Sequence, residues 1–236
     1  MSHDHKVASV AFLIADRARV AMLMFLLDGK ARPAGELADV AGVTAQTASS
    51  HLSKLLAGEL LAVETTGRHR HYRLANAHVA AALEKLAVVG TLQPSQQKRE
   101  NRKIQELRFA RCCYDHLAGR VGVVVTQAMQ RQDLLVAASD KRFDVTAAGV
   151  DWFYRFGLDM GQWDLRKRDS AHQCLDSTEH QHHLAGALGK QFMSTLCSKG
   201  WLYRQERSRA VYVTPAGWGG LKKLLDVDAQ SFLQAE

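Results

Sequence analysis

The sequence predicts a mostly helical chain with small β-hairpins, an α+β fold, and three observations support this prediction. Of its 236 residues only three are proline and 47% are hydrophobic, which favours packed helices. Apolar residues recur at helical spacing through the first segment, 6–28, namely at Val7, Val10, Ile14, Ala21 and Phe25. Apolar residues alternate in the short segment 60–74, which predicts a hairpin. The length is enough for two domains, each with its own core.

Residues 33–75 are expected to form two short helices joined by a tight turn, followed by a hairpin. Pro33 suits a first helical position, and Gly42 suits the turn between the helices. Thr44 is expected to cap the second helix through its side-chain oxygen. The order of elements predicts a helix-turn-helix with a β-hairpin wing.

The outer face of the second helix carries hydroxyls, an amide and a cation but no carboxylate. Such a surface suits the major groove of DNA, although polar helix faces are also often merely solvated. Arg68 and Arg70, beside Gly67 at the hairpin tip, are placed to touch phosphates. The candidate DNA-binding residues are Thr44, Gln46, Thr47, Ser49, Ser50, His51, Lys54, Arg68 and Arg70.

The segment 43–61 resembles the recognition helix of the ArsR/SmtB family of bacterial winged-helix repressors. The family's Ser-x-His-Leu-x-x-Leu pattern is matched here by Ser49, His51, Leu52 and Leu55. The wing of the family is similar to Gly67-Arg68 together with residues 72–74. The resemblance covers roughly residues 10–90. It implies a homodimer that represses transcription by binding a palindromic double-stranded DNA operator and releases it when an effector arrives.

The composition agrees with that expectation. A net charge of +7 fits a polyanionic partner, although charge alone would not prove one. Four cysteines without regular spacing predict no disulfide framework and therefore a reducing cytoplasm. No apolar stretch is long enough to cross a bilayer, so no membrane partner is expected.

Three parts are expected along the chain: a winged helix-turn-helix domain at 1–92, linking and dimerising helices at 93–139, and a C-terminal module at 140–236. Asn76 is expected to cap a helix ending near Val89, and 90–95 is predicted to be a linker. A long basic helix is predicted over 96–118. After a bend at Gly119 and Gly122, helix is expected to continue over 123–138.

The C-terminal module is expected to be winged-helix-like, with a sensing or dimerising role. A helix with apolar residues at Leu184, Leu188, Phe192 and Leu196 precedes predicted strands at 201–205 and 210–213. The segments 145–149 and 213–217 echo each other, each a strand end entering a Thr-capped helix. The segments 108–119 and 174–189 resemble parts of a two-module subgroup of ArsR-type regulators.

The effector is expected to be a metal ion or a small organic molecule bound in the C-terminal module. The family's usual metal positions lack their ligands here, since no cysteine occurs in the first 111 residues. Cys112 and His116 would lie one helical turn apart, with Cys113 in the core. The full set of candidate ligands is Cys112, His116, Cys174, Asp176, His180 and His183.

Other interpretations stay open at this point. The segment with His183 and Asp176 could be a surface loop hydrogen-bonded for structural reasons, and redox chemistry at Cys112, Cys113 or Cys174 would need a lowered thiol pKa. Aromatic residues such as Trp152, Phe156 and Trp163 could line an organic cavity or form an ordinary core. No enzymatic activity is expected, because no glycine-rich cofactor turn or catalytic constellation is present. The alternatives are a non-catalytic assembly module and a methyltransferase-like enzyme with a winged-helix head.

Overall fold

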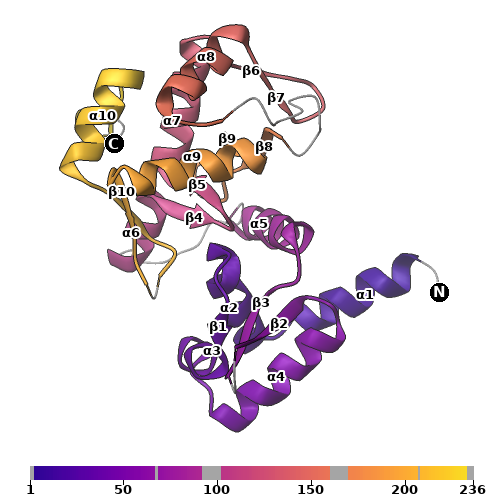
Figure 1. Ribbon diagram of the computed structural model, residues 1–236. Coiled ribbons are helices and arrows are strands. Elements are labelled where there is room, and N and C mark those ends of the chain that lie inside the picture. Colours follow the sequence, from indigo (N-terminus) through magenta and orange to yellow (C-terminus); the bar gives the residue numbers. More distant parts are fainter. Residues whose placement is uncertain (1–2, 67–68, 92–101, 160–169, 207, 233–236) are drawn as a thin grey trace. The chain divides into compact units, whose positions relative to one another are not determined.

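The computed structural model describes all residues except 1–2, 67–68, 92–101, 160–169, 207 and 233–236 (Figure 1). Helices dominate, and every sheet is small and antiparallel, which confirms the predicted fold class. The chain divides into two compact units, Met1–Leu83 and Glu84–Glu236.

The first unit begins with two helices where the sequence predicted one. Helix α1 spans His3–Ile14, helix α2 spans Arg17–Phe25, and a short 3₁₀ turn, η1, follows at Leu26–Asp28. The single helix expected over 6–28 is therefore wrong. The break occurs because the Asp16 carboxylate accepts a hydrogen bond from the Arg19 amide at 2.9 Å and so caps a new helix.

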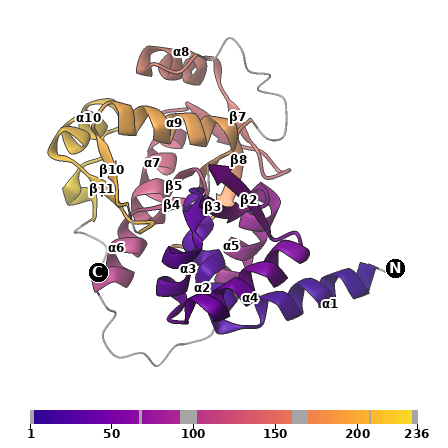
Figure 2. The ribbon, with the colours of Figure 1, turned by 60° about the horizontal axis from the view of Figure 1, so that its bottom comes forward.

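The helix-turn-helix and the wing are present as predicted. Helix α3 (Ala34–Ala41) and helix α4 (Ala45–Ala57) precede a hairpin of β2 (Leu61–Thr66) and β3 (His69–Leu74). A short strand β1 (Arg32–Pro33) pairs with β3 to complete the sheet. Pro33 lies at the N-cap of α3, one residue before the first helical position that the sequence suggests for it. Helices α2, α3 and α4 pack against one another around a buried apolar core (Figure 2).

Three local signals in this region have their expected roles. Gly42 ends α3 in the left-handed conformation, with φ of 64°, which costs a glycine little. The Thr44 hydroxyl accepts a hydrogen bond from the Thr47 amide at 3.2 Å and caps α4. Asn76 likewise caps helix α5 (Ala77–Thr91), accepting hydrogen bonds from the His78 and Val79 amides.

Helix α5 extends slightly beyond its predicted end, and residues 92–95 of the predicted linker lie outside the described part of the chain. Its first half belongs to the first unit and its second half, from Glu84, to the second.

The predicted long helix over 96–118 is wrong over its second half. Helix α6 spans only Arg102–Phe109, and a tight hairpin of β4 (Arg111–Cys113) and β5 (His116–Ala118) follows. The chain reverses at Tyr114, whose φ of 59° is incompatible with a right-handed helix. Helix α7 (Gly119–Arg131) then ends earlier than expected, since strand β6 begins at Leu135.

The second unit contains the same succession of elements twice: hairpin, helix, hairpin, helix. The first repeat (111–156) consists of β4, β5, α7, β6 (Leu135–Ala137), β7 (Phe143–Val145) and α8 (Ala147–Phe156). The second repeat (172–225) consists of β8 (His172–Leu175), β9 (His182–Ala185), α9 (Gly186–Ser198), β10 (Leu202–Arg204), β11 (Val211–Val213) and α10 (Pro215–Leu225). A 3₁₀ turn, η2, follows at Ala229–Phe232.

Equivalent residues of the two repeats make equivalent contacts. Thr146 caps α8 through the Gly149 amide, and Thr214 caps α10 through the Gly217 amide, so the predicted echo is confirmed. The predicted strands near 201–205 and 210–213 are also present.

The two repeats pair with each other reciprocally. Strand β4 of the first repeat forms a bridge between Arg111 and Ala210, while β8 of the second forms one between His172 and Arg142. Both repeats contribute to one hydrophobic core, which includes Met129, Phe143, Phe192 and Leu221. The two halves therefore form one folded unit.

Candidate nucleic-acid interface and candidate metal centre

Helix α4 buries one face and leaves the other open. Ala48, Leu52 and Leu55 are almost fully buried against the rest of the first unit. The opposite face contains no carboxylate, and its exposed polar residues include Thr44, Gln46, Thr47, Ser49, Ser50 and Lys54. This face offers side-chain donors and acceptors of the kind that read base edges in a major groove.

His51 is an exception among the residues predicted to contact DNA. Its Nδ1 atom lies 3.5 Å from an Arg19 guanidinium nitrogen and 3.9 Å from a carboxylate oxygen of Asp16, and its side chain is only 14% exposed. The imidazole therefore connects α4 to the start of α2. This placement favours a role for His51 in positioning α4 over direct contact with a base.

The wing presents one of its arginines to solvent. Arg70 on β3 is exposed, and its guanidinium carbon lies 5.6 Å from the centre of the Tyr72 ring, which holds the charge on the hairpin surface. Arg73 instead pairs with Glu64 and donates to the Leu74 carbonyl at 3.0 Å. Arg68 lies outside the described residues.

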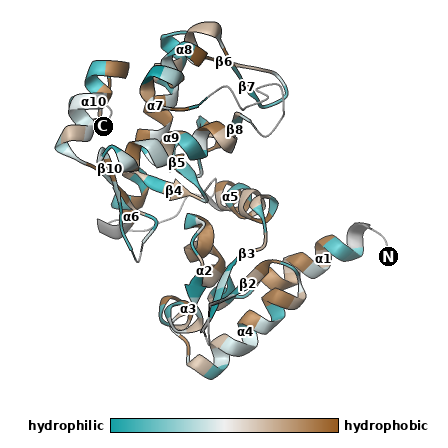
Figure 3. Cartoon of the chain, in the orientation of Figure 1, coloured by the Kyte–Doolittle hydropathy of each residue, from teal (hydrophilic) through white to brown (hydrophobic). Residues whose placement is uncertain are grey.

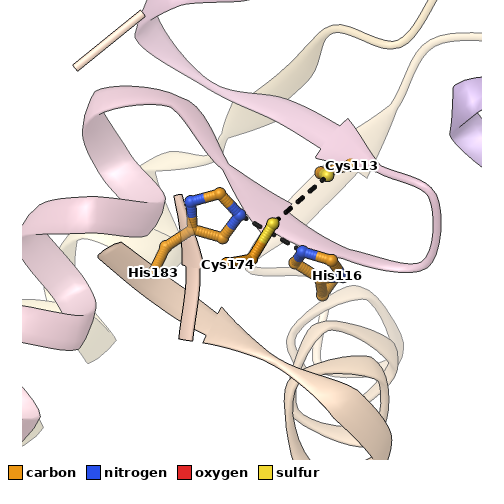
Figure 4. A group of neighbouring side chains, drawn as sticks. All are labelled: Cys113, His116, Cys174 and His183. Atoms are coloured by element: carbon orange, nitrogen blue, oxygen red, sulfur yellow. Dashed lines mark hydrogen bonds between the residues drawn. The ribbon is translucent and has the colours of Figure 1, made fainter. Parts of the chain in front are cut away.

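Four potential metal ligands meet in the second unit, two from each repeat (Figure 4). Cys113 on β4 is paired directly across its hairpin with His116 on β5, and Cys174 on β8 is paired in the same way with His183 on β9. The two sulfur atoms lie 4.0 Å apart, and the two imidazole Nε2 atoms lie 3.2 Å apart. All four potential ligand atoms lie within 4.8 Å of one another.

The cluster is enclosed, and each imidazole has a carboxylate behind it. Cys113, His116 and His183 are buried, and Cys174 is partly buried. His116 Nδ1 lies 3.1 Å from an Asp115 oxygen, and His183 Nδ1 lies 3.3 Å from an oxygen of Asp176. The Nε2 atoms of the two rings point toward each other within the cluster (Figure 4).

Asp176 supports the cluster and is not one of its four potential ligands. One of its oxygens is 2.9 Å from the Arg111 guanidinium and the other accepts a hydrogen bond from the Gly119 amide at 2.7 Å. Burial opposes its ionisation, but the contact with His183 and the charge of Arg111 hold the pKa of Asp176 far below its usual range. The prediction of Asp176 as a ligand is therefore corrected to a role beside the ligands.

The predicted roles of the two adjacent cysteines are reversed. The Cys112 sulfur lies 3.8 Å from the Met193 sulfur in the core, whereas Cys113 faces the cluster. The error follows from the secondary structure, because neighbouring residues point to opposite faces of a strand, whereas the prediction assumed a helix. His180 is also excluded from the ligand group, since it lies in the turn between β8 and β9.

The surroundings favour the neutral thiol of Cys113 in the absence of a cation. The contact with the Cys174 thiol and burial raise the pKa of Cys113 well above its usual value. A positive charge among these ligands would reverse this effect, because a metal stabilises the thiolate.

Several aromatic residues of the second unit pack together in an ordinary core. Trp152 and Phe156 are stacked with ring centres 5.2 Å apart, and both pack against Phe192. The ring centres of Phe156 and Trp201 lie 5.6 Å apart. Trp163 lies outside the described residues. The packing of these rings favours the core interpretation over an organic cavity.

A solvent-facing helix without acidic residues, preceded by a tight turn and followed by a three-stranded wing, defines a winged helix-turn-helix DNA-binding protein. A family model described as a helix-turn-helix domain matches residues 14–64. No helix among the described residues has the length and apolar character needed to span a bilayer.

Relatives extend this assignment over almost the whole chain. The uncharacterized HTH-type transcriptional regulator YdfF of Bacillus subtilis is 39% identical over 221 residues, which cover 94% of this chain and 97% of that protein. The HTH-type transcriptional regulator CmtR of Mycobacterium tuberculosis is 37% identical over 86 residues, which cover 36% of this chain and 72% of that protein. The chain belongs to the family of HTH-type transcriptional regulators.

Among solved structures, a similar one is the homodimeric winged helix-turn-helix domain of a possible ArsR-family regulator from Mycobacterium bovis. It is 26% identical, with a TM-score of 0.36, and the match covers 41% of this chain and 89% of that chain.

Proposed function

We propose that this regulator is a homodimeric repressor whose two α4 helices read a palindromic operator. The carboxylate-free exposed face of α4 is the observation that carries the proposal. In a dimer, two such helices enter successive major grooves about 10 base pairs apart. Gln46 would read a base edge, and Thr44, Thr47, Ser49 and Ser50 would contact neighbouring bases or phosphates.

The cations beside this face supply the affinity that does not depend on sequence. Lys54 lies on α4 and Arg70 on the wing, both exposed, and Arg68 belongs to the same hairpin by sequence. Each phosphate that a cation neutralises releases condensed counterions, so binding should weaken steeply with salt.

Helix α1 is the surface that we assign to the partner subunit. Beyond its first turn it consists mainly of hydrophobic residues (brown in Figure 3). Val7 is 65% exposed and Phe12 is 74% exposed in the single chain. A second copy would cover these side chains.

The effector, in this proposal, acts on the second unit. A ligand changes DNA affinity only if it binds the DNA-competent and released states with different affinities. Helix α5 carries residues of both units, and its Glu84 is paired with Arg209 at 3.0 Å within the second. Among the described residues of the second unit, the Cys/His cluster is the best-formed group of ligand atoms, so a metal ion is favoured over an organic effector.

Gel shifts over a range of salt concentrations test the DNA contacts. Replacement of both Arg68 and Arg70 by alanine should weaken binding and reduce the slope of log affinity against log salt by about 0.9 for each phosphate that is no longer neutralised. In the control, Arg155 and Lys190, two exposed cations of the second unit, are replaced by alanine. This variant should leave the slope of log affinity against log salt unchanged. Wild-type affinity of the wing variant at every salt concentration would contradict the assignment.

A further inference from the structure

We infer that Cys113, His116, Cys174 and His183 bind one tetrahedral divalent metal ion of the zinc class, at the junction of the two repeats. The inference rests on the metal effector of the proposed function and deepens it by naming the ligands and the class of metal. Metal binding tests it without DNA, so its failure can be distinguished from a failure of DNA recognition.

The distances agree with such a site. Zinc bound to sulfur at about 2.3 Å and to nitrogen at about 2.0–2.1 Å sets tetrahedral edges of about 3.8 Å between sulfurs and about 3.3 Å between nitrogens. The sulfur atoms of Cys113 and Cys174 lie 4.0 Å apart, and the Nε2 atoms of His116 and His183 lie 3.2 Å apart. Small shifts of the side chains would complete the tetrahedron.

The ligands come from equivalent positions of the two repeats. Each repeat contributes one cysteine and one histidine that are directly paired across its first hairpin. After each histidine comes Leu-Ala-Gly, and the glycines, Gly119 and Gly186, have φ of 77° and 80°. The repeated backbone thus presents the same two ligands from two sides.

The second layer of contacts also has the form expected around a metal. Histidine ligands commonly donate their remaining ring N–H to a carboxylate, which fixes the tautomer and directs the other nitrogen to the ion. Asp115 is placed to do this for His116 at 3.1 Å. An oxygen of Asp176 lies 3.3 Å from His183 Nδ1, which makes no hydrogen bond in this structure, so a small rotation of the ring would complete the second contact. In the absence of a cation, this arrangement would aim two Nε2 lone pairs at each other.

The ligand chemistry selects the class of metal. Two thiolates and two imidazoles suit zinc and its tetrahedral relatives, whereas magnesium and calcium prefer oxygen. Four protein ligands in an enclosed site leave no position for substrate, as in structural zinc centres. The ion would therefore hold the β4–β5 hairpin to the β8–β9 hairpin.

Metal analysis of the full-length chain tests the inference. Protein purified with added zinc and then desalted should retain one zinc per chain by mass spectrometric metal analysis. The variants Cys113→Ser and Cys174→Ser should each lose it, whereas Cys197→Ser, which changes a cysteine of α9 outside the cluster, should keep it. Absence of retained zinc in the wild type, or retention in the Cys113→Ser and Cys174→Ser double variant, would overturn the inference.

Cobalt substitution provides a readout that does not depend on the folding of the serine variants. Wild-type protein loaded with Co²⁺ should show intense tetrahedral visible bands and a near-ultraviolet thiolate-to-cobalt band. His116→Cys keeps four ligands and adds a thiolate, so the thiolate-to-cobalt absorbance should increase. A weak octahedral spectrum of the wild type, or a Cys113–Cys174 disulfide in protein prepared under reductant, would contradict the site.

Discussion

The Nε2 atoms of His116 and His183 lie 3.2 Å apart although the residues are 67 positions apart in the sequence. Each imidazole lies on the second strand of a hairpin, next to its own carboxylate and across from its own cysteine. Neither repeat supplies more than half of the cluster. The centre of the second unit is therefore built by the association of two similar halves.

The carboxylate behind His116 should tune metal affinity. Asp115→Asn removes the charge that orients the His116 ring, and we expect zinc affinity to fall about 10–100-fold. Competition with a chromophoric chelator measures the change. Asp144→Asn, an exposed carboxylate of the same unit, is the matched control and should have little effect. Equal affinities of the two variants would show that Asp115 does not position the ligand.

The ion pair of Arg111 with Asp176 should be critical for folding. Both side chains are almost fully buried, at 2% and 0% exposure, so removing one leaves an uncompensated charge. Arg111→Met should lower the free energy of unfolding by about 3–5 kcal/mol. Arg142→Met, which breaks pairs with partly exposed carboxylates, should cost less than about 1 kcal/mol. Urea unfolding of both variants gives the comparison, and similar costs would argue against a special role for the buried pair.

A methyl group at Gly189 should disturb the second hairpin. A Cβ atom there would lie 2.6 Å from the Leu184 carbonyl oxygen and 3.3 Å from the His116 Cβ. Gly189→Ala should therefore destabilise the protein by about 1–3 kcal/mol, measured by thermal and urea unfolding. Gly219→Ala, in α10 where nothing lies within 4 Å, should be neutral or stabilising by up to about 1 kcal/mol. A Gly189→Ala variant with the stability of the wild type would contradict this close approach of helix and strand.

The Asp16 cap should depend on pH. Its hydrogen bond with the Arg19 amide is the largest cause of a pKa below the usual 3.8. A group whose pKa is lower in the folded state contributes stability above its unfolded pKa, and this is lost as pH falls through the folded value. Asp16→Ala should cost about 1 kcal/mol at neutral pH.

Asp16→Asn separates the hydrogen bond from the charge, since the amide can still accept from the Arg19 N–H. The stability difference between wild type and Asp16→Asn, followed by urea unfolding, should shrink below about pH 4. A difference that grows on acidification would have the wrong sign for this account.

Local signals explain why the first unit could be predicted from sequence. Gly42, Thr44 and Asn76 each act on a backbone within a few residues, and each has its predicted role. The break at Asp16 was missed because the apolar pattern continues across it. Helix capping there overrides a periodicity that by itself predicts one helix.

The cluster could be predicted only in part, because its geometry depends on long-range pairing. The sequence indicates His116, Cys174 and His183 as ligands, but it places Cys113 in the core because it predicts a helix over that segment. The turn at Tyr114 has no glycine or proline to mark it. A signal was present in the matching His-Leu-Ala-Gly segments at 116–119 and 183–186, but the turns before these histidines differ in length, which obscured the repeat.

Selection of DNA from randomised duplexes tests the central claim most directly. The wild-type protein should enrich a palindrome with half-sites about 10 base pairs apart, bound at least about 10³-fold more tightly than unrelated DNA at physiological salt. Gln46→Ala should lose about 1–3 kcal/mol of discrimination at one position of each half-site. Enrichment of no motif, or an unchanged motif and affinity for Gln46→Ala, would contradict recognition through α4.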